Sequence, residues 1–229
     1  MPFDKTLKDK IRAGRMAGYH TLVYLLGLAL LAWGFDNLAG FFSNPVRAGL
    51  AIIAVTQVLI HIGVILRMPP QPEREWPADL EHWHYGLAEL IAILAAFGDR
   101  RNVLTWAENP PLRWVGLGVL LLGAVYAIWT NLTWVNHERR ATDRACDNPV
   151  LLCEGPYRWT RYPTLLVLIF YSLGFGLAFR SWTGLIFLIV LIGTIIRRIN
   201  LWEKMYAARY KQVWALRCQT SKRLIPFLY

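Results

Sequence analysis

Apolar residues form six runs along the chain, and polar segments rich in proline or arginine separate them. An apolar run of about 20 residues is long enough to cross a bilayer as a helix. Several runs approach that length, so the pattern predicts an all-α fold, a polytopic membrane protein that forms a single domain over residues 1–229. The predicted transmembrane helices cover residues 19–34, 47–66, 84–98, 114–135, 163–179 and 182–196.

The last two predicted helices are separated only by the sequence "RSW" at residues 180–182. So short a link predicts an antiparallel helical hairpin, whose two free ends lie at the same face of the membrane. Residues 151–163 and 197–214 are therefore predicted neighbours, which brings Glu203 near Arg158 and Arg161. Apolar and aromatic residues recur at helical spacing after residue 197, and they predict a cytoplasmic amphipathic helix at the membrane surface.

Lysine and arginine are distributed unevenly between the two predicted sides of the membrane. If all six helices cross and the N-terminus is cytoplasmic, 20 of the 25 basic residues lie on the cytoplasmic side. Because basic loops stay in the cytoplasm, both chain ends are predicted to be cytoplasmic. The net charge of +10 is then explained by contact with anionic lipid, and no nucleic-acid partner is expected.

Composition supports an integral membrane protein. Hydrophobic residues make up 55% of the chain and charged residues only 17%, whereas soluble domains carry about 25% charged residues. The 11 tryptophans and 10 tyrosines are typical of side chains at membrane interfaces. Three cysteines without paired spacing favour a reducing compartment, and the short loops without targeting signals favour a bacterial inner membrane.

Two motifs flank the predicted hairpin. The sequence "GPYRWTRYP" at 155–163 resembles the "GPYRxxRHP" signature of the isoprenylcysteine carboxyl methyltransferase family, which includes phospholipid methyltransferase relatives. Glu203, Tyr210, Trp214 and Pro226 are similarly spaced to that family's acidic pair, aromatics and terminal "IP". The resemblance covers residues 115–229, with residues 1–113 as generic membrane helices. It implies an S-adenosylmethionine-dependent methyltransferase for a lipidic, prenylated or other amphipathic substrate.

The resemblance also implies a site in the two segments beside the hairpin. Methyl transfer is an in-line displacement at an activated sulfonium carbon, so the protein mainly positions the reactants and excludes water. Within such a site Glu203 suits an ammonium group, an arginine suits a carboxylate, and aromatic rings suit adenine or a cation. The expected catalytic residues are Arg161, Tyr162 and Glu203. The expected cofactor-binding residues are Leu152, Gly155, Pro156, Tyr157, Arg158, Trp202 and Glu203.

Two departures from the signature leave catalysis open. Tyr162 stands in place of the family's histidine, and Trp202 in place of the first acid of the pair. A phenol donates a hydrogen bond but does not replace an imidazole at neutral pH. One alternative is therefore a catalytically inactive, lipid-binding member of the family.

A second alternative is an NADPH-dependent reductase. The tail also resembles the membrane sterol reductases, whose pattern is matched by Tyr210, Trp214, Cys218, Pro226 and Tyr229. Such an enzyme needs a site for the 2′-phosphate, which Arg197, Arg198 and Lys204 are suited to supply. The "GPYR" sequence favours the methyltransferase.

Four polar residues lie inside the predicted spans: Gln57, His61, Glu89 and Asn131. Polar side chains within membrane helices usually face the interior of the bundle. Glu89 is the predicted partner of His61. No metal site is expected, because His82, His84 and His137 have no further ligands at suitable spacing.

Overall fold

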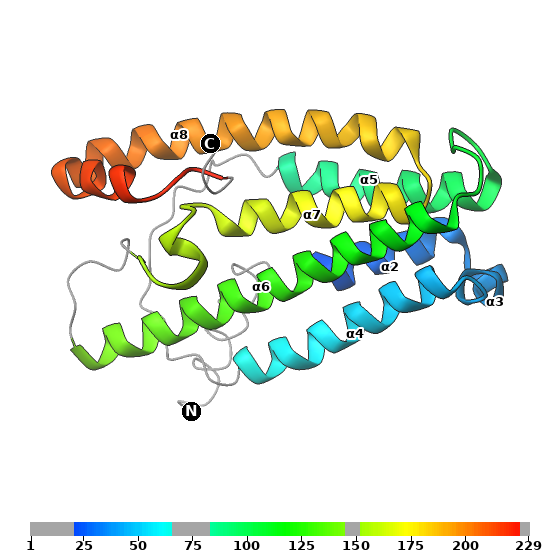
Figure 1. Ribbon diagram of the computed structural model, residues 1–229, viewed down its shortest axis with the longest axis horizontal. Helices are drawn as coiled ribbons and strands as arrows, with labels where there is room; N and C mark the ends of the chain where they lie inside the picture. Colours follow the sequence, from blue (N-terminus) through cyan, green and yellow to red (C-terminus); the bar gives the residue numbers. More distant parts are fainter. Residues whose placement is uncertain (1–20, 66–82, 145–151, 225–229) are drawn as a thin grey trace, which may run out of the picture.

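The computed structural model describes residues 21–65, 83–144 and 152–224, and in this part of the chain the regular structure is helical. The long helices lie side by side in a bundle (Figure 1). Extended pairing in the described residues is confined to two isolated bridges. The elements are α2 (Thr21–Trp33), η1 (Phe35–Asn37), α3 (Leu38–Phe42), α4 (Pro45–Ile65), α5 (Trp83–Arg101), α6 (Pro110–Arg144), η2 (Gly155–Arg158), α7 (Pro163–Ala178) and α8 (Trp182–Thr220).

Helices are present at all six predicted positions, and the all-α prediction is confirmed for the described residues. Three helical stretches are long and apolar enough to cross a membrane: Pro45–Val64, Pro110–His137 and Trp182–Thr220. A fourth is added if α2 and the segment Phe35–Phe42, bent by 84° from it, form one span. These three to four candidate spans indicate an integral membrane protein, whereas the number six stays a prediction.

The two helices that carry the most polar residues at their ends are longer than predicted. α6 does not end near residue 135 but continues to Arg144, and α8 continues past residue 196 to a break at Lys211, so a separate helix begins there and not at residue 197. At 1.5 Å per residue the 35 residues of α6 span about 52 Å, against about 30 Å for the hydrocarbon core. Both helices therefore project well beyond the apolar layer on one side.

α8 is broken at Lys211, whose φ of 42° and ψ of −115° are not helical. Beyond this break the chain turns back, and the tail at 221–224 runs toward the segment that precedes α7 (Figure 1). A left-handed φ is unfavourable for a residue with a side chain, so the contacts of the returning tail must hold this conformation.

Close approach of α6 and α7 depends on glycine. A Cβ atom on Gly116 would lie 2.5 Å from the backbone nitrogen of Ala178, and one on Gly174 would meet the side chain of Leu120. Small residues at such positions let membrane helices pack backbone to backbone. The α7–α8 hairpin is thereby fixed against α6, and α5 packs on the other side of the bundle against α2, α7 and α8.

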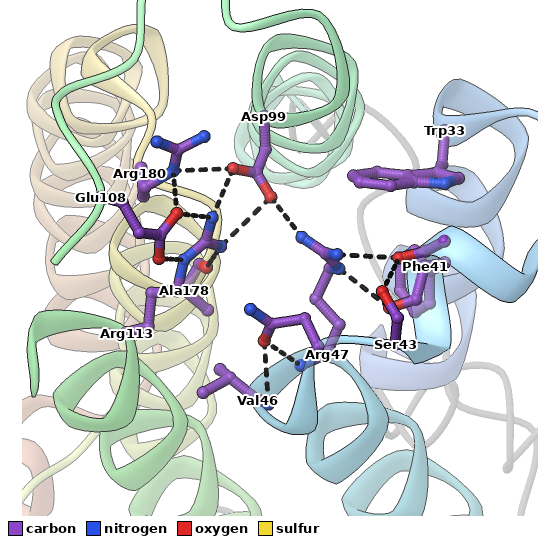
Figure 2. A network of polar contacts seen from close by, with 12 residues as sticks. Trp33, Phe41, Ser43, Val46, Arg47, Asp99, Glu108, Arg113, Ala178 and Arg180 are labelled. Carbon is purple, nitrogen blue, oxygen red and sulfur yellow. Dashed lines mark hydrogen bonds and ion pairs between the residues drawn. The ribbon is translucent and has the colours of Figure 1, made fainter. Parts of the chain in front are cut away.

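A charge network joins the elements at the end of the bundle that holds the α7–α8 turn. The carboxylate of Asp99, at the end of α5, is completely buried and binds three arginines (Figure 2). Its oxygens lie 2.8 Å from Arg47 Nη1, 2.8 Å from Arg113 Nη2 and 2.9 Å from Arg180 Nε. These arginines come from α4, α6 and the turn between α7 and α8, so one carboxylate ties four parts of the chain together.

Two further acidic residues lie at the same end. Glu108 accepts a hydrogen bond of 2.6 Å from Arg113 Nε, and this bond lowers the pKa of the Glu108 carboxyl. Arg100 pairs with Asp36, with 2.8 Å between Arg100 Nη1 and Asp36 Oδ1. Four of the five basic residues that the sequence assigns to the outer side therefore have a carboxylate partner.

Candidate functional site

The site is assembled by backbone pairing between the segment before α7 and the tail after α8. Arg161 N donates to Lys222 O at 2.8 Å, and Lys222 N donates to Trp159 O at 2.9 Å. Tyr162 N also donates to Arg223 O at 3.2 Å. The pairing holds the tail beside residues 159–162, next to the point where Pro163 starts α7 with its preset helical φ.

Glu203, on α8, is the centre of the polar contacts at this site. Arg161 binds it through two nitrogens, with Nε 2.8 Å from Oε1 and Nη2 3.3 Å from Oε2. Tyr162 donates its hydroxyl to Oε1 at 3.2 Å, and Arg223 Nε lies 3.7 Å from Oε2. The predicted proximity of Glu203 and Arg161 is confirmed, and their side chains are only 12% and 7% exposed.

Arg158 was also predicted to lie near Glu203, but the structure shows no contact between them. It is exposed at the end of η2, and its described contacts do not reach Glu203, whose charged partners are Arg161 and Arg223. Because Arg158 is exposed and forms no described ion pair with Glu203, it remains a candidate only for contacts with a ligand or with lipid.

Aromatic rings surround the Glu203 carboxylate. The ring centroids of Tyr162 and Trp202 lie 5.5 Å apart, and those of Tyr206 and Trp214 lie 4.8 Å apart. The guanidinium of Arg198 lies 4.3 Å from the Trp202 ring centroid, a cation–π contact. Tyr162 and Trp202, the two departures from the resembling signature, therefore pack against each other in one aromatic wall.

Tyr162 acts here as a hydrogen-bond donor. Burial raises the pKa of its phenol above the ordinary value of 10.0, and the negative charge of Glu203 raises it further. The hydroxyl consequently keeps its proton at neutral pH and remains available to Glu203. It is not suited to remove a proton from a substrate, which is the role that an imidazole fills.

The η2 turn forms the other side of the site. Gly155 has a φ of +55°, and a Cβ atom there would collide with the Thr133 side chain on α6, so glycine suits both the turn and the close approach. Leu152 and Pro156 are buried, and the backbone carbonyls of Leu152 and Tyr157 both accept hydrogen bonds from Arg217 Nη2. Burial also raises the pKa of the Tyr157 phenol.

The site lies about one membrane thickness from the start of α8. Glu203 follows Trp182, the first residue of α8, by 21 positions, which corresponds to about 32 Å along a helix. If α8 enters a membrane at Trp182, a hydrocarbon core of about 30 Å would put Glu203 at the level of the lipid headgroups, at the opposite end of the bundle from the Asp99 network. A polar ligand from the aqueous side and a lipid from the bilayer could both reach that depth.

Several residues contribute to the site although they were not among the predicted catalytic and cofactor-binding residues. Arg161 Nη1 donates to the carbonyl of Ser221, Cys218 Sγ lies 3.9 Å from Glu203 Oε2, and Arg223 faces Glu203. Ser221, Cys218 and Arg223 all lie beyond the break at Lys211, and the only available signal was helical spacing, which does not reveal the turn at Lys211. Pro226 and Tyr229 lie outside the described residues.

The intramembrane polar residues are paired across helices. The Asn131 Nδ2 atom lies 3.0 Å from His61 Nε2, which gives His61 a partner on α6 where the sequence predicted Glu89 on α5. Gln57 Nε2 donates to the hydroxyl of Tyr171 at 2.6 Å. α4 packs chiefly on α6 and α2, and this arrangement favours the Asn131 contact over one with α5.

A scan against family models and searches of curated proteins and solved structures give no match to this chain. Within the three described ranges, no three histidine, cysteine, aspartate or glutamate side chains come together as a metal site. The fold defines an all-helical protein with three to four candidate membrane spans. The chemistry of the site must be argued from its residues.

Proposed function

We propose that the protein is a membrane-embedded, S-adenosylmethionine-dependent methyltransferase that acts on a lipidic or amphipathic substrate. The observation that carries this proposal is the Glu203 cluster, built from the two segments that resemble methyltransferase motifs, and a membrane that α8 enters at Trp182 would hold this cluster at headgroup depth. One carboxylate, two paired arginines and a wall of aromatic rings form a site for a ligand with both polar and planar parts.

The donor set fits the cofactor, which would supply an activated methyl group next to the acceptor. Glu203 would hold the cofactor's ammonium group by taking it in place of Arg223, whose Nε–Oε2 distance of 3.7 Å is the longest charged contact of this carboxylate. Trp202 and Tyr206 would cover the planar or cationic parts, and the η2 backbone would close the site against water.

The acceptor would reach the site sideways from the bilayer. Trp129 on α6 and Trp159 after η2 are both partly exposed, and their ring centroids lie 5.5 Å apart. Exposed tryptophans at headgroup level are typical of surfaces that meet lipid. A carboxylate or thiolate acceptor needs no proton removal, which suits a site whose tyrosine stays protonated.

Direct binding measurements test the proposal. Purified protein in detergent should bind S-adenosylmethionine and its demethylated product in calorimetry, and Glu203→Ala should abolish the signal. Arg209→Gln, which changes an exposed arginine on the same helix, is the matched control. If neither ligand binds wild-type protein at millimolar concentration, the methyltransferase proposal is wrong.

A second candidate is supported by the excess of basic residues near the site. Arg161 and Arg223 bind Glu203, Arg198 stacks on the neighbouring Trp202, and Arg217 binds the η2 region. Such an excess of positive charge suits a phosphate-bearing cofactor such as NADPH. Exposed Arg197 and Lys204 lie on the same helix. Binding of NADPH without S-adenosylmethionine would favour the reductase. If neither cofactor binds and lipid is still retained on purification, the inactive lipid-binding protein is favoured. In that protein the ion pair between Arg161 and Glu203 is purely structural.

A further inference from the structure

Four arginines are buried among the described residues: Arg47, Arg113, Arg180 and Arg217. The first three share Asp99, so their charges are compensated within the bundle. Burying an ionised group without a counter-ion is costly, and a protein usually avoids it by pairing the group. The three arginines around Asp99 are paired in this way.

Arg217 is the exception. Its side chain lies on the distal part of α8, the residue is only 7% exposed, and no carboxylate among the described residues forms an ion pair with it. One nitrogen, Nη2, donates to the carbonyls of Leu152, at 3.0 Å, and Tyr157. Carbonyl dipoles carry partial charges, so these bonds orient the guanidinium without neutralising it.

Two donor atoms of Arg217 remain available. Nε and Nη1 form no hydrogen bond within the described part of the chain, and neither is among the described polar atoms that are sealed from solvent without a partner. The carbonyls of Leu152 and Tyr157 thus occupy Nη2 and orient the guanidinium, while the N–H groups of Nε and Nη1 stay open. These two atoms lie on different edges of the guanidinium, so each is suited to donate a single charge-assisted hydrogen bond to an oxyanion.

The surroundings add to the excess of positive charge. Ser221 connects Arg217 to the Glu203 cluster, since its carbonyl accepts from Arg161 and its hydroxyl donates to the Arg217 carbonyl at 2.8 Å. Arg161 and Arg223 already share Glu203. The region therefore holds three guanidinium groups, those of Arg161, Arg217 and Arg223, against the single carboxylate of Glu203. One negative charge does not balance three positive charges.

We propose that Arg217 is the anchor of an anion site, between η2 and the distal part of α8, whose ligand is an anionic oxygen group. Two sources supply this chemistry at headgroup depth. One is the carboxylate of the cofactor's amino-acid part, and this source rests on the proposed function. The other is the phosphate of a lipid headgroup, which does not depend on methyl transfer.

Two ligand pairs separate these sources, and in each pair only the anionic group differs. The first pair is S-adenosylmethionine and its decarboxylated analogue. The second is dioctanoyl phosphatidic acid and dioctanoylglycerol. Binding of all four is measured on detergent-solubilised full-length protein by native mass spectrometry, for wild type, Arg217→Gln and the control Arg209→Gln.

In at least one pair, the member that carries the anionic group should bind wild type and the control about tenfold more tightly than the member that lacks it, and Arg217→Gln should lose this preference. The proposal is overturned if neither pair shows a preference in wild type, or if the preference persists in Arg217→Gln. Should Arg217→Gln not fold, Arg217→Lys keeps the charge but loses the guanidinium that the Leu152 and Tyr157 carbonyls orient, and its preference should fall below that of wild type. An unchanged preference in Arg217→Lys counts against the proposal.

The two proposals fail separately. Suppose that wild type binds neither S-adenosylmethionine nor its analogue but binds phosphatidic acid more tightly than dioctanoylglycerol, and that this preference depends on Arg217. The methyltransferase proposal is then wrong and the anion site is supported. If S-adenosylmethionine binds as tightly as its decarboxylated analogue and wild type binds the two lipids equally, the anion site is wrong and the cofactor proposal is supported.

Discussion

Glu203 and Asp99 are both carboxylates that hold arginines, but the contacts around them differ in kind. Asp99 is fully enclosed and all its charged partners lie within 2.9 Å. Glu203 keeps 12% exposure, a looser partner in Arg223 and a neutral donor in Tyr162. Asp99 therefore has the environment of a structural clamp, whereas Glu203 has one in which a partner can be exchanged for a ligand.

Tyr162→Phe removes the hydroxyl that donates to Glu203 and keeps the ring against Trp202. The fold should be preserved, and the affinity for S-adenosylmethionine should fall about three- to tenfold, since Glu203 loses one of the bonds that orient it. Calorimetric titration measures this change. Tyr210→Phe, on the same aromatic surface, is the control and should stay within about twofold of wild type.

The pH dependence of the same binding reaction tests the role given to Tyr162. Its pKa is raised by burial, so the phenol is protonated in the folded protein, and with an ordinary value of 10.0 it is also protonated in the unfolded chain at neutral pH. The Tyr162→Phe effect should consequently be constant across the neutral range. A loss of affinity that grows as pH rises there would contradict a neutral, hydrogen-bonding tyrosine.

Asp99→Asn should destabilise the protein strongly. It leaves Arg47 and Arg180 buried without their main counter-ion, and breaking a buried ion pair costs about 3–5 kcal/mol. Thermal unfolding of the detergent-solubilised protein should show a large fall in Tm, or no folded protein. Asp36→Asn, which removes an exposed partner of Arg100, should leave Tm unchanged. Equal effects of the two variants would show that the network is not the clamp inferred from its geometry.

At the scale of elements, the contact between α6 and α7 determines where the hairpin sits. Gly116 faces the α7 backbone, whereas Gly118, two positions along the same helix, is exposed and has no atom within 4 Å of its Cβ position. Gly116→Ala should push the helices apart and lower Tm by several degrees. Gly118→Ala should leave Tm equal or raise it, because alanine favours helix by about 1 kcal/mol.

The hydrophobic pattern predicted the positions of the helices well, because burial in lipid or in the bundle sets where apolar runs occur. It did not predict helix ends that lie in polar sequence. α6 runs on through Arg139 and Arg140, and α8 through Arg197 and Arg198, where backbone hydrogen bonding continues after hydrophobicity stops. The break at Lys211 carries no proline or glycine and was not predictable from local propensity.

The candidate site was predictable in part. The short link between α7 and α8 was enough to bring Glu203 to Arg161. The role of the tail, and with it Arg217, Ser221 and Arg223, depends on backbone pairing between residues about 60 positions apart, which periodicity does not encode. The Asp99 network was missed for the same reason, since its arginines are isolated in sequence and appeared as ordinary loop charges.

At the scale of the whole molecule, the two ends of the bundle differ in how their charges are used. At the Asp99 end four of five arginines are paired with carboxylates, while the other end displays exposed basic residues such as Lys204 and Lys211. Exposed basic charge favours the cytoplasmic side of a membrane. We therefore predict that the Glu203 end, both chain ends included, faces the cytoplasm of a bacterial inner membrane.

Cysteine labelling tests this orientation. Val103 is exposed in the turn after α5, at the Asp99 end, and Cys153 is exposed near η2. A membrane-impermeant maleimide should label Val103→Cys in intact cells, with the outer membrane permeabilised. It should label the wild-type protein only after the inner membrane is opened. Labelling of the wild type in intact cells would reverse the predicted orientation.

The break at Lys211 also has a consequence for how the protein is made. Every helix of the described bundle precedes residue 211 or ends soon after it, yet Ser221, Lys222 and Arg223 complete the contacts around Arg161 and Glu203. During synthesis the helices can enter the membrane and pack while these residues are still inside the ribosome. The nascent chain at that stage is a packed bundle that lacks part of the site, and the proposed ligand site would be complete only after residues 221–223 have left the ribosome and turned back.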